Sequence, residues 1–238
     1  MNEKNPTLRQ LGFISFLAAI VLGILLIAAR AWPDMESTFY GFVKYDYPAI
    51  PSLKCPVLMT SLDQQAVTIR LHNQLERDLK WYINTQLSTS VVMSTSEQTV
   101  QLAPGETRTI SWEVDKDNID LSDFIFANVF ISPAAAMKMQ SSTCGTLVLN
   151  LPLSGGPVIF YSAVAIYGVI LALGLWVWSR HSEMSNPGTI SMAWWMRFVG
   201  LIITIGIVEG ILDWWFLGIL SLVLTMLSLG VFLFPHKD

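Results

Sequence analysis

The hydrophobic residues of this 238-residue chain are concentrated towards its two ends, and a polar stretch separates them. Residues 11–29 contain no charged side chain, and residues 157–234 are strongly apolar with few charges. Between them, residues 31–156 contain short runs in which apolar and polar positions alternate. An uncharged run of about 20 residues has the length of a transmembrane helix, whereas alternation with period two predicts β-strands. The pattern therefore predicts a membrane-embedded helical part that carries one β-rich insert.

The first apolar run, Leu11 to Ala29, is long enough to cross a membrane as a helix. A helix of 19 residues spans about 30 Å, which is the thickness of the hydrocarbon layer. A cleaved signal peptide, the competing interpretation, has an apolar core of only about 7–15 residues. We therefore interpret residues 1–30 as a cytoplasmic tail followed by a first transmembrane helix that acts as an uncleaved signal anchor.

Residues 157–238 contain the remaining predicted spans, connected by short loops. The second span is Val158–Trp178, the third is Met192–Val208 and the fourth is Trp214–Phe234. This gives four transmembrane helices. In the three-span alternative, residues 189–208 form a re-entrant or interfacial segment and the C-terminus lies outside.

Three charged residues interrupt this last apolar region, and they bear on orientation. We expect Arg197 to extend to the cytoplasmic headgroups, and Glu209 and Asp213 to meet water in a tight outer hairpin. In the four-span arrangement the basic residues of the tails and short loops share one side: Lys4, Arg9, Arg180, Arg197 and Lys237. Because positive charge marks the cytoplasmic side, both termini are predicted to be cytoplasmic in a prokaryotic plasma membrane, with residues 31–156 extracytoplasmic. Arg30 is an exception on the outer flank.

The insert divides into two parts of different composition. Residues 31–54 are rich in aromatic residues and proline, which predicts a juxtamembrane collar at the headgroups or, alternatively, a contact surface for a subunit or lipid. Residues 55–156 contain seven short alternating segments, which predict a β-sandwich. The predicted strands are Val57–Leu62, Ala66–His72, Leu79–Leu87, Thr99–Leu102, Arg108–Val114, Phe124–Ile131 and Thr146–Leu151.

The clearest turn in this domain is the sequence Ala103-Pro104-Gly105-Glu106-Thr107, which joins two predicted strands. Pro-Gly supplies the negative and then positive φ angles of a type II turn. Together with Asn73 at the end of an earlier strand, this turn resembles those of bacterial immunoglobulin-like and fibronectin-type adhesion domains. The resemblance covers residues 55–151, and it implies an immunoglobulin-like β-sandwich that serves as a binding or spacer domain without catalysis.

The two cysteines, Cys55 and Cys144, both lie in the predicted outer domain. If their strands are neighbours, a disulfide closes a loop of about 90 residues, which oxidising compartments permit. Two unpaired thiols and a redox pair are the alternatives. The wide spacing, without a CxxC motif, gives no support for oxidoreductase chemistry.

Composition argues against several functions. The chain is 53% hydrophobic and 13% charged, about half the charged fraction of an ordinary soluble domain. Residues 31–156 hold 13 acidic and 8 basic side chains, a net charge of −5, which offers no basic surface for nucleic acid. The sequence contains no phosphate-binding loop, dinucleotide fingerprint or hydrolase motif. We therefore expect that the chain is not an enzyme.

Three groups of potential ligands lack the spacing or setting that their chemistry needs. They are the acidic residues Glu113, Asp115, Asp117, Asp120 and Asp123, the methionines Met93, Met137 and Met139, and the histidines His72, His181 and His236. The acidic run departs from the EF-hand spacing for calcium, and the methionines have no histidine or cysteine nearby for copper. The histidines lie outside the apolar spans in which haem ligands usually occur. We expect no catalytic, cofactor-binding or metal-binding residues.

Small residues recur three or four positions apart in the predicted spans, a spacing typical of closely packed helices. They are Ala19, Gly23, Gly168, Ala172, Gly206, Gly210, Gly218, Ser221, Thr225 and Ser228. They predict packing within this chain or, alternatively, a seam against another subunit.

These observations favour a non-catalytic accessory, scaffold or sensor subunit of a membrane assembly that binds through its outer domain. The expected partners are membrane lipid and either other membrane subunits or further copies of the chain. The alternative is a small homo-oligomeric channel or transporter with a sandwich cap.

Overall fold

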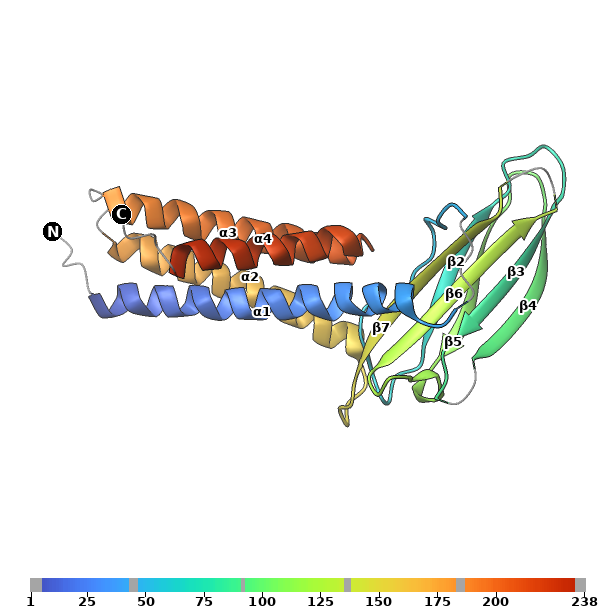
Figure 1. Ribbon diagram of the computed structural model, residues 1–238, viewed down its shortest axis with the longest axis horizontal. Helices are drawn as coiled ribbons and strands as arrows, with labels where there is room; N and C mark the ends of the chain where they lie inside the picture. Colours follow the sequence, from blue (N-terminus) through green and yellow to red (C-terminus); the bar gives the residue numbers. More distant parts are fainter. Residues whose placement is uncertain (1–5, 43–46, 91–92, 135–137, 183–186, 234–238) are drawn as a thin grey trace. The chain divides into compact units, whose positions relative to one another are not determined.

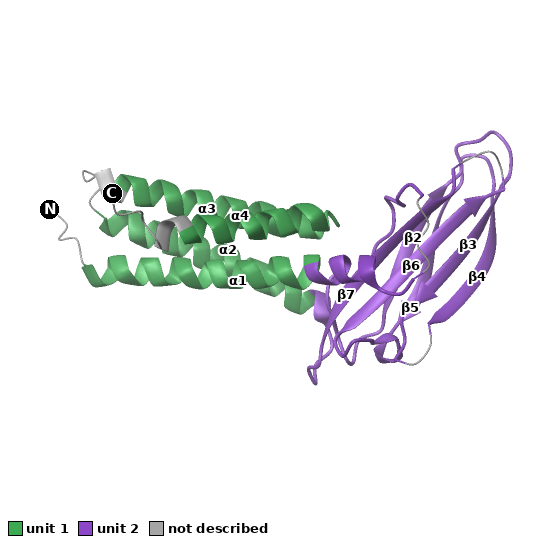
Figure 2. Cartoon of the chain, viewed as in Figure 1, with its two compact units in different colours: residues 1–31, 158–238 green, residues 32–157 purple. Residues whose placement is uncertain are grey.

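The computed structural model describes residues 6–42, 47–90, 93–134, 138–182 and 187–233. The described chain contains four α-helices and seven β-strands (Figure 1). It forms two compact units: a helical unit of residues 1–31 and 158–238, and a β unit of residues 32–157 (Figure 2). The helix α1 contributes residues to both units.

The helices are α1 (Pro6–Phe39), α2 (Gly156–His181), α3 (Pro187–Ile211) and α4 (Trp215–Leu233). Three of them contain a stretch long and apolar enough to cross a membrane, namely Pro6–Phe39, Gly156–His181 and Ile190–Ile211. The apolar stretch of α4, Trp215–Gly230, is shorter. The prediction of a helical membrane protein with several spans agrees with these lengths.

The hairpin between α3 and α4 is tighter than the sequence indicated. We expected Glu209 and Gly210 in the turn, but α3 continues through both residues to Ile211. The turn consists of residues 212–214, and Asp213 there has a φ of +63°. A residue in the left-handed backbone conformation at this position reverses the direction of the chain within a few residues. Aspartate, with its short polar side chain, tolerates that conformation.

Within the helical unit, glycines allow close backbone contact. A Cβ atom on Gly12 would lie 2.6 Å from the backbone nitrogen of Trp178, and one on Gly174 would lie 2.8 Å from that of Phe16, so α1 and α2 pack through this pair. A Cβ on Gly206 would lie 2.7 Å from Ile27 of α1. Several predicted packing residues also lie in contacts inside this unit: Ala19, Gly23, Gly206, Gly210, Gly218, Ser221 and Thr225.

The predicted packing pair of the second span has a different environment. A Cβ atom on Gly168 would meet no described atom within 4 Å, and Ala172 is exposed. Gly174, which the pattern did not single out, takes the packing role on α2 instead. Ser228, on α4, is half-buried, and its carbonyl accepts a hydrogen bond from Trp195 Nε1 at 3.4 Å. The small face formed by Gly168 and Ala172 therefore remains open on the described helical unit.

The β unit contains two sheets. The strands are β1 (Met59–Thr60), β2 (Gln65–His72), β3 (Leu79–Leu87), β4 (Ser94–Leu102), β5 (Thr107–Val114), β6 (Phe124–Pro133) and β7 (Gln140–Leu149). Five of them form a mixed sheet in the order β1-β7-β6-β3-β4, in which β1 is parallel to β7, and β2 pairs with β5 in a second sheet. Each predicted strand overlaps one observed strand. The ends of β4 and β7 differ most, since both begin well before the predicted residue.

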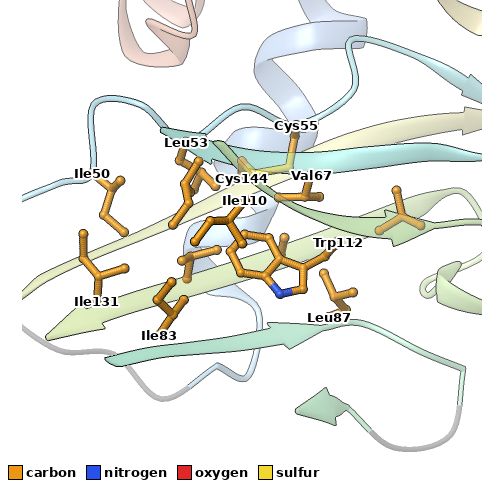
Figure 3. Packing of buried hydrophobic residues seen from close by; sticks show 14 of the residues in the cluster. Ile50, Leu53, Cys55, Val67, Ile83, Leu87, Ile110, Trp112, Ile131 and Cys144 are labelled. Carbon is orange, nitrogen blue, oxygen red and sulfur yellow. A yellow bond between two sulfur atoms is a disulfide. The ribbon is translucent and has the colours of Figure 1, made fainter. Parts of the chain in front are cut away.

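The two sheets enclose one hydrophobic core (Figure 3). Val67 of β2 and Trp112 of β5 meet Ile83 of β3 there, and all are at least 91% buried. Cys55 and Cys144 form a disulfide beside this core, with their Cα atoms 6.0 Å apart, so the predicted pairing is confirmed. The described residues contain no free cysteine.

The last turns of α1 belong to the β unit, so this helix extends ten residues beyond Ala29, where we expected the first span to end. Asp34 Oδ1 accepts a hydrogen bond from the backbone nitrogen of Gly145 on β7 at 2.9 Å, and Ser37 Oγ lies 3.3 Å from Thr143 Oγ1. A Cβ atom at position 145 would lie 2.1 Å from the carbonyl oxygen of Pro33. Contact with β7 explains why a proline-containing stretch of the expected collar is helical.

Candidate functional site

The outer face of the five-stranded sheet, the face turned away from the core, is covered over one part and open over another. Residues 33–42 and 47–50 lie over the part formed by β6 and β7: Tyr40 packs on Phe126 at 4.6 Å between ring centroids, and Tyr47 packs on Phe130 at 5.7 Å. Beside it lies an open hollow of about 530 Å³ over β3, β4 and β6. Its volume falls within the range of about 300–1,000 Å³ that small-molecule sites occupy.

Alternation along β3 places a row of polar and aromatic side chains in this hollow. Trp81, Ile83 and Thr85 point into the core, so Tyr82, Asn84 and Gln86 point outwards. The residues that line the hollow from the three strands are Tyr82, Ile83, Asn84, Gln86, Glu97, Gln98, Thr99, Asn128 and Phe130. None of these positions was among the predicted site residues.

Hydrogen bonds across the strands hold these polar side chains in place. Asn84 Nδ2 donates to Glu97 Oε1 at 3.0 Å, from a residue directly opposite in the antiparallel register. Asn128 Nδ2 donates to Gln86 Oε1 at 3.3 Å, again from directly opposite positions. Each amide carries two N–H donors and an oxygen acceptor. Asn84 and Gln86 therefore keep donors or acceptors for a ligand beyond these contacts.

The helical unit contains a second concentration of polar groups around Arg30, which is only 2% exposed. Its Nε donates to the carbonyl oxygen of Gly210 at 3.1 Å, and its Nη2 forms an ion pair with Asp213. Asp213, which we expected to meet water in the outer hairpin, has a side chain that is 34% exposed and also pairs with the buried guanidinium that α1 brings to that hairpin. The exceptional position of Arg30 on the outer flank was the signal for such a partner.

The other two predicted intramembrane or interfacial charges have separate environments. Glu209 is half-buried on α3, and its Oε2 accepts a hydrogen bond from Ser221 Oγ of α4 at 3.1 Å. Arg197 is exposed and lines a small hollow of about 210 Å³ with residues of α2, including Trp178. Arg197 and Glu209 are not brought together, as their spacing along one helix indicated.

Asp63 fixes the place where the chain leaves the β unit for α2. Its Oδ1 accepts from the backbone nitrogen of Gly155 at 2.6 Å, and its Oδ2 accepts from those of Gly156 and Thr60, both at 2.8 Å. Burial by itself raises the pKa of this carboxyl, but the three backbone donors outweigh burial and hold the pKa below its usual value. Its position before the first turn of α2 is where a carboxylate also meets the positive end of the helix dipole.

Replacing Asp63 with asparagine is expected to destabilise the protein by about 1.5–3 kcal/mol near pH 7, since charge-assisted hydrogen bonds to a buried carboxylate are lost. A carboxyl with a lowered folded-state pKa stabilises above its unfolded pKa, and this contribution disappears as the pH falls through the folded pKa. Thermal unfolding should therefore show the stability of the variant approaching that of the wild type in acid, as the pH falls through the lowered pKa of Asp63. Exposed Asp123 provides the control substitution, and a difference that stays constant with pH would contradict this role.

The ligand groups that we rejected from the sequence are dispersed or otherwise engaged. Asp115 caps the short 3₁₀ helix Lys116–Asn118, and Asp120 accepts a hydrogen bond from Tyr40. Burial of the Tyr40 hydroxyl is the larger cause, and the contact with Asp120 the smaller, that together raise the pKa of Tyr40 to about 12. Across the described segments, no three histidine, cysteine, aspartate or glutamate residues are grouped to hold a metal ion. Met137 and His236 lie outside the described residues.

Comparisons with known proteins assign no family. No protein-family model matches the chain, and no curated protein matches it. Among solved structures, two β-glucuronidase chains of Bacteroides uniformis are similar over 40% of this chain and 12% of their own length. Their sequence identities are 16% and 13%, and the TM-scores are 0.29 and 0.30. The matched segment is a small part of those enzymes, and the likeness is too slight to indicate a fold or an activity.

Proposed function

We propose that the chain is a non-catalytic accessory, scaffold or sensor subunit of a membrane assembly, anchored by α1 to α4 as four spans and binding through its β unit. The observation that carries this proposal is the open hollow over β3, β4 and β6. The neighbouring part of the same sheet face is covered by residues 33–42 and 47–50 of the chain itself. An exposed concave surface with ordered polar groups is suited to recognition.

The arrangement of the β unit supports an immunoglobulin-like sandwich as the binding domain. Seven strands divide into sheets of five and two, and the first strand is parallel to the last. Trp81, which is 6% exposed, lies on the third strand, where immunoglobulin domains carry a buried tryptophan. The disulfide differs from the usual one of that fold, since it joins Cys55, before β1, to Cys144 of β7.

The disulfide also supports an extracytoplasmic location for the β unit. Disulfides persist in oxidising compartments and are rare in the reducing cytoplasm. Arg180 lies in the last turn of α2, at the end of that helix remote in sequence from the β unit, as the positive-inside rule requires for this orientation. Both termini are then cytoplasmic.

Purification of the full chain in mild detergent tests the proposal. We expect native mass spectrometry to find a stoichiometric complex with other membrane subunits, and liposomes containing the chain to remain impermeable to ions. A symmetric homo-oligomer that conducts ions would contradict the proposal and favour the channel alternative.

A substitution on the open face of α2 can locate the contact with those subunits. Gly168→Ile places a larger side chain where the helical unit has open space, so the chain should fold normally. We expect it to dissociate the complex, because small residues allow close helix contact. Val169→Leu, at a position 58% exposed on the same helix, is the control. An intact complex with Gly168→Ile would show that the contact lies elsewhere.

A further inference from the structure

The open hollow on the β unit is lined by aromatic rings, amides and one carboxylate. Its floor is the outward face of β3 between β4 and β6, and Tyr47, packed on Phe130, lies at the boundary of the covered part of the sheet. Tyr82 is 50% exposed there although aromatic rings are more often buried. The exposed ring and the ordered amides point to recognition of a small ligand more than to a role in the core.

The polar groups favour a ligand that both donates and accepts hydrogen bonds. Asn84 and Gln86 are amides, and each offers both functions, whereas Asn128 is buried and holds Gln86 in place. Glu97 is the single formal charge of the lining, and it already accepts a hydrogen bond from Asn84. Without a cationic lining residue, a phosphate or carboxylate ligand would face an unfavourable carboxylate. A single engaged carboxylate also gives little support to a cation.

The two aromatic rings supply apolar platforms on either side of an amide. Phe130 lies directly opposite Asn84, and Tyr82 precedes Asn84 by two positions on the same strand. Both rings therefore project from the same face and are diagonal neighbours across β3 and β6. A sugar ring has an apolar C–H face that packs on aromatic rings and a rim of hydroxyl groups that suits amides and carboxylates. Aliphatic ligands lack the hydroxyls, and ions lack the apolar face.

We propose that this hollow binds a neutral oligosaccharide, with Tyr82 and Phe130 packing against sugar rings and Asn84, Gln86 and Glu97 hydrogen-bonding to the hydroxyls. The inference rests on the proposed function of the β unit as a binding domain, and it specifies the class of ligand. The hydrogen bonds between Asn84 and Glu97 and between Asn128 and Gln86 fix the side chains before the ligand arrives, which lowers the entropy lost on binding.

The test is titration calorimetry of the full chain, held in lipid nanodiscs because glycosidic detergents would compete for the hollow. The probes are neutral hexasaccharides of glucose, of mannose and of N-acetylglucosamine, with a hexauronate as the acidic contrast. We expect at least one neutral probe to bind and the hexauronate to bind at least tenfold more weakly. Tyr82→Ala and Asn84→Ala should each weaken binding by tenfold or more, while Tyr82→Phe retains most of it.

Matched controls separate this site from the rest of the protein. Tyr161 on α2 is 49% exposed, close to the exposure of Tyr82, and Gln101 is an exposed amide on β4 that hydrogen-bonds to Asp78 at 2.8 Å. Tyr161→Ala and Gln101→Ala should leave binding unchanged. Failure of every neutral probe, tighter binding of the hexauronate, or binding unaffected by both Tyr82→Ala and Asn84→Ala would overturn the inference. A hetero-complex found by mass spectrometry would uphold the proposed function in each of those cases.

Discussion

Replacing Asp213 with alanine is expected to destabilise the helical unit by about 3–5 kcal/mol, because Arg30 then loses the carboxylate of a buried ion pair. Arg30 is 2% exposed, so little water is available to replace that carboxylate. The side chain of Asp213 is 34% exposed, and the reverse loss, with Arg30→Met, should be smaller for that reason. Thermal unfolding of the full chain in detergent, followed by helical circular dichroism, measures both effects.

A double substitution separates the contribution of the ion pair to stability from the cost of leaving one of its charges without the other. Arg30→Met with Asp213→Ala removes both charges, and methionine keeps the aliphatic contact that Arg30 makes with Gly210. We expect the double variant to be more stable than Asp213→Ala alone, since a buried pair replaced by apolar groups is often nearly neutral in stability. Asp123→Ala, at an exposed position, is the control and should change stability by less than about 0.5 kcal/mol. An Asp213→Ala protein as stable as this control would show that the ion pair contributes nothing.

Removing the disulfide by Cys55→Ala with Cys144→Ala should destabilise the β unit by about 4–5 kcal/mol. The bridge joins residues 89 positions apart, and the chain-entropy model assigns this amount to closing so long a loop in the unfolded chain. Thermal unfolding, followed by tryptophan fluorescence, measures the loss.

Wild-type protein with a reductant added during unfolding is the companion experiment for the disulfide. It should unfold at a temperature close to that of the double variant, whereas the helical unit should respond little to either change. Both cysteines are 8% exposed, so reduction of the folded protein needs confirmation by alkylation and mass measurement. If both thiols are alkylated and the unfolding temperature is unchanged, the bridge does not stabilise the fold.

The strands were predictable where one face is buried and the other is exposed. Leu79–Leu87 has the predicted boundaries because its odd-numbered residues are buried and its even-numbered residues are not. Ser94–Glu97 were missed at the start of β4 because they are exposed on both faces, so they carry no alternation. The first half of β7 was missed for a similar reason: Gln140 to Thr143 are polar, and pairing with β6 makes them a strand.

The candidate site was less predictable than the strands that carry it. Tyr82 and Asn84 are outward positions of a strand whose bounds were predicted correctly, but polar outward positions occur on every such strand. What distinguishes them is the register that sets Glu97 and Phe130 beside Asn84, and the covering of the adjacent face by the end of α1. The ion pair of Arg30 with Asp213 joins residues 183 positions apart, a distance over which sequence periodicity carries no information.

Strand β7 has a consequence for biosynthesis. Cys144 forms the disulfide on one side of this strand, and its neighbour Gly145 contacts the end of α1 on the other side. Neither contact can therefore form before β7, the last strand of the β unit, has been synthesised. At about 5–20 residues per second, the ribosome takes roughly 5–20 seconds to pass from Cys55 to Cys144. During that interval Cys55 has no partner thiol within its own chain, so the disulfide and the contact between α1 and Gly145 can form only after β7 has been synthesised.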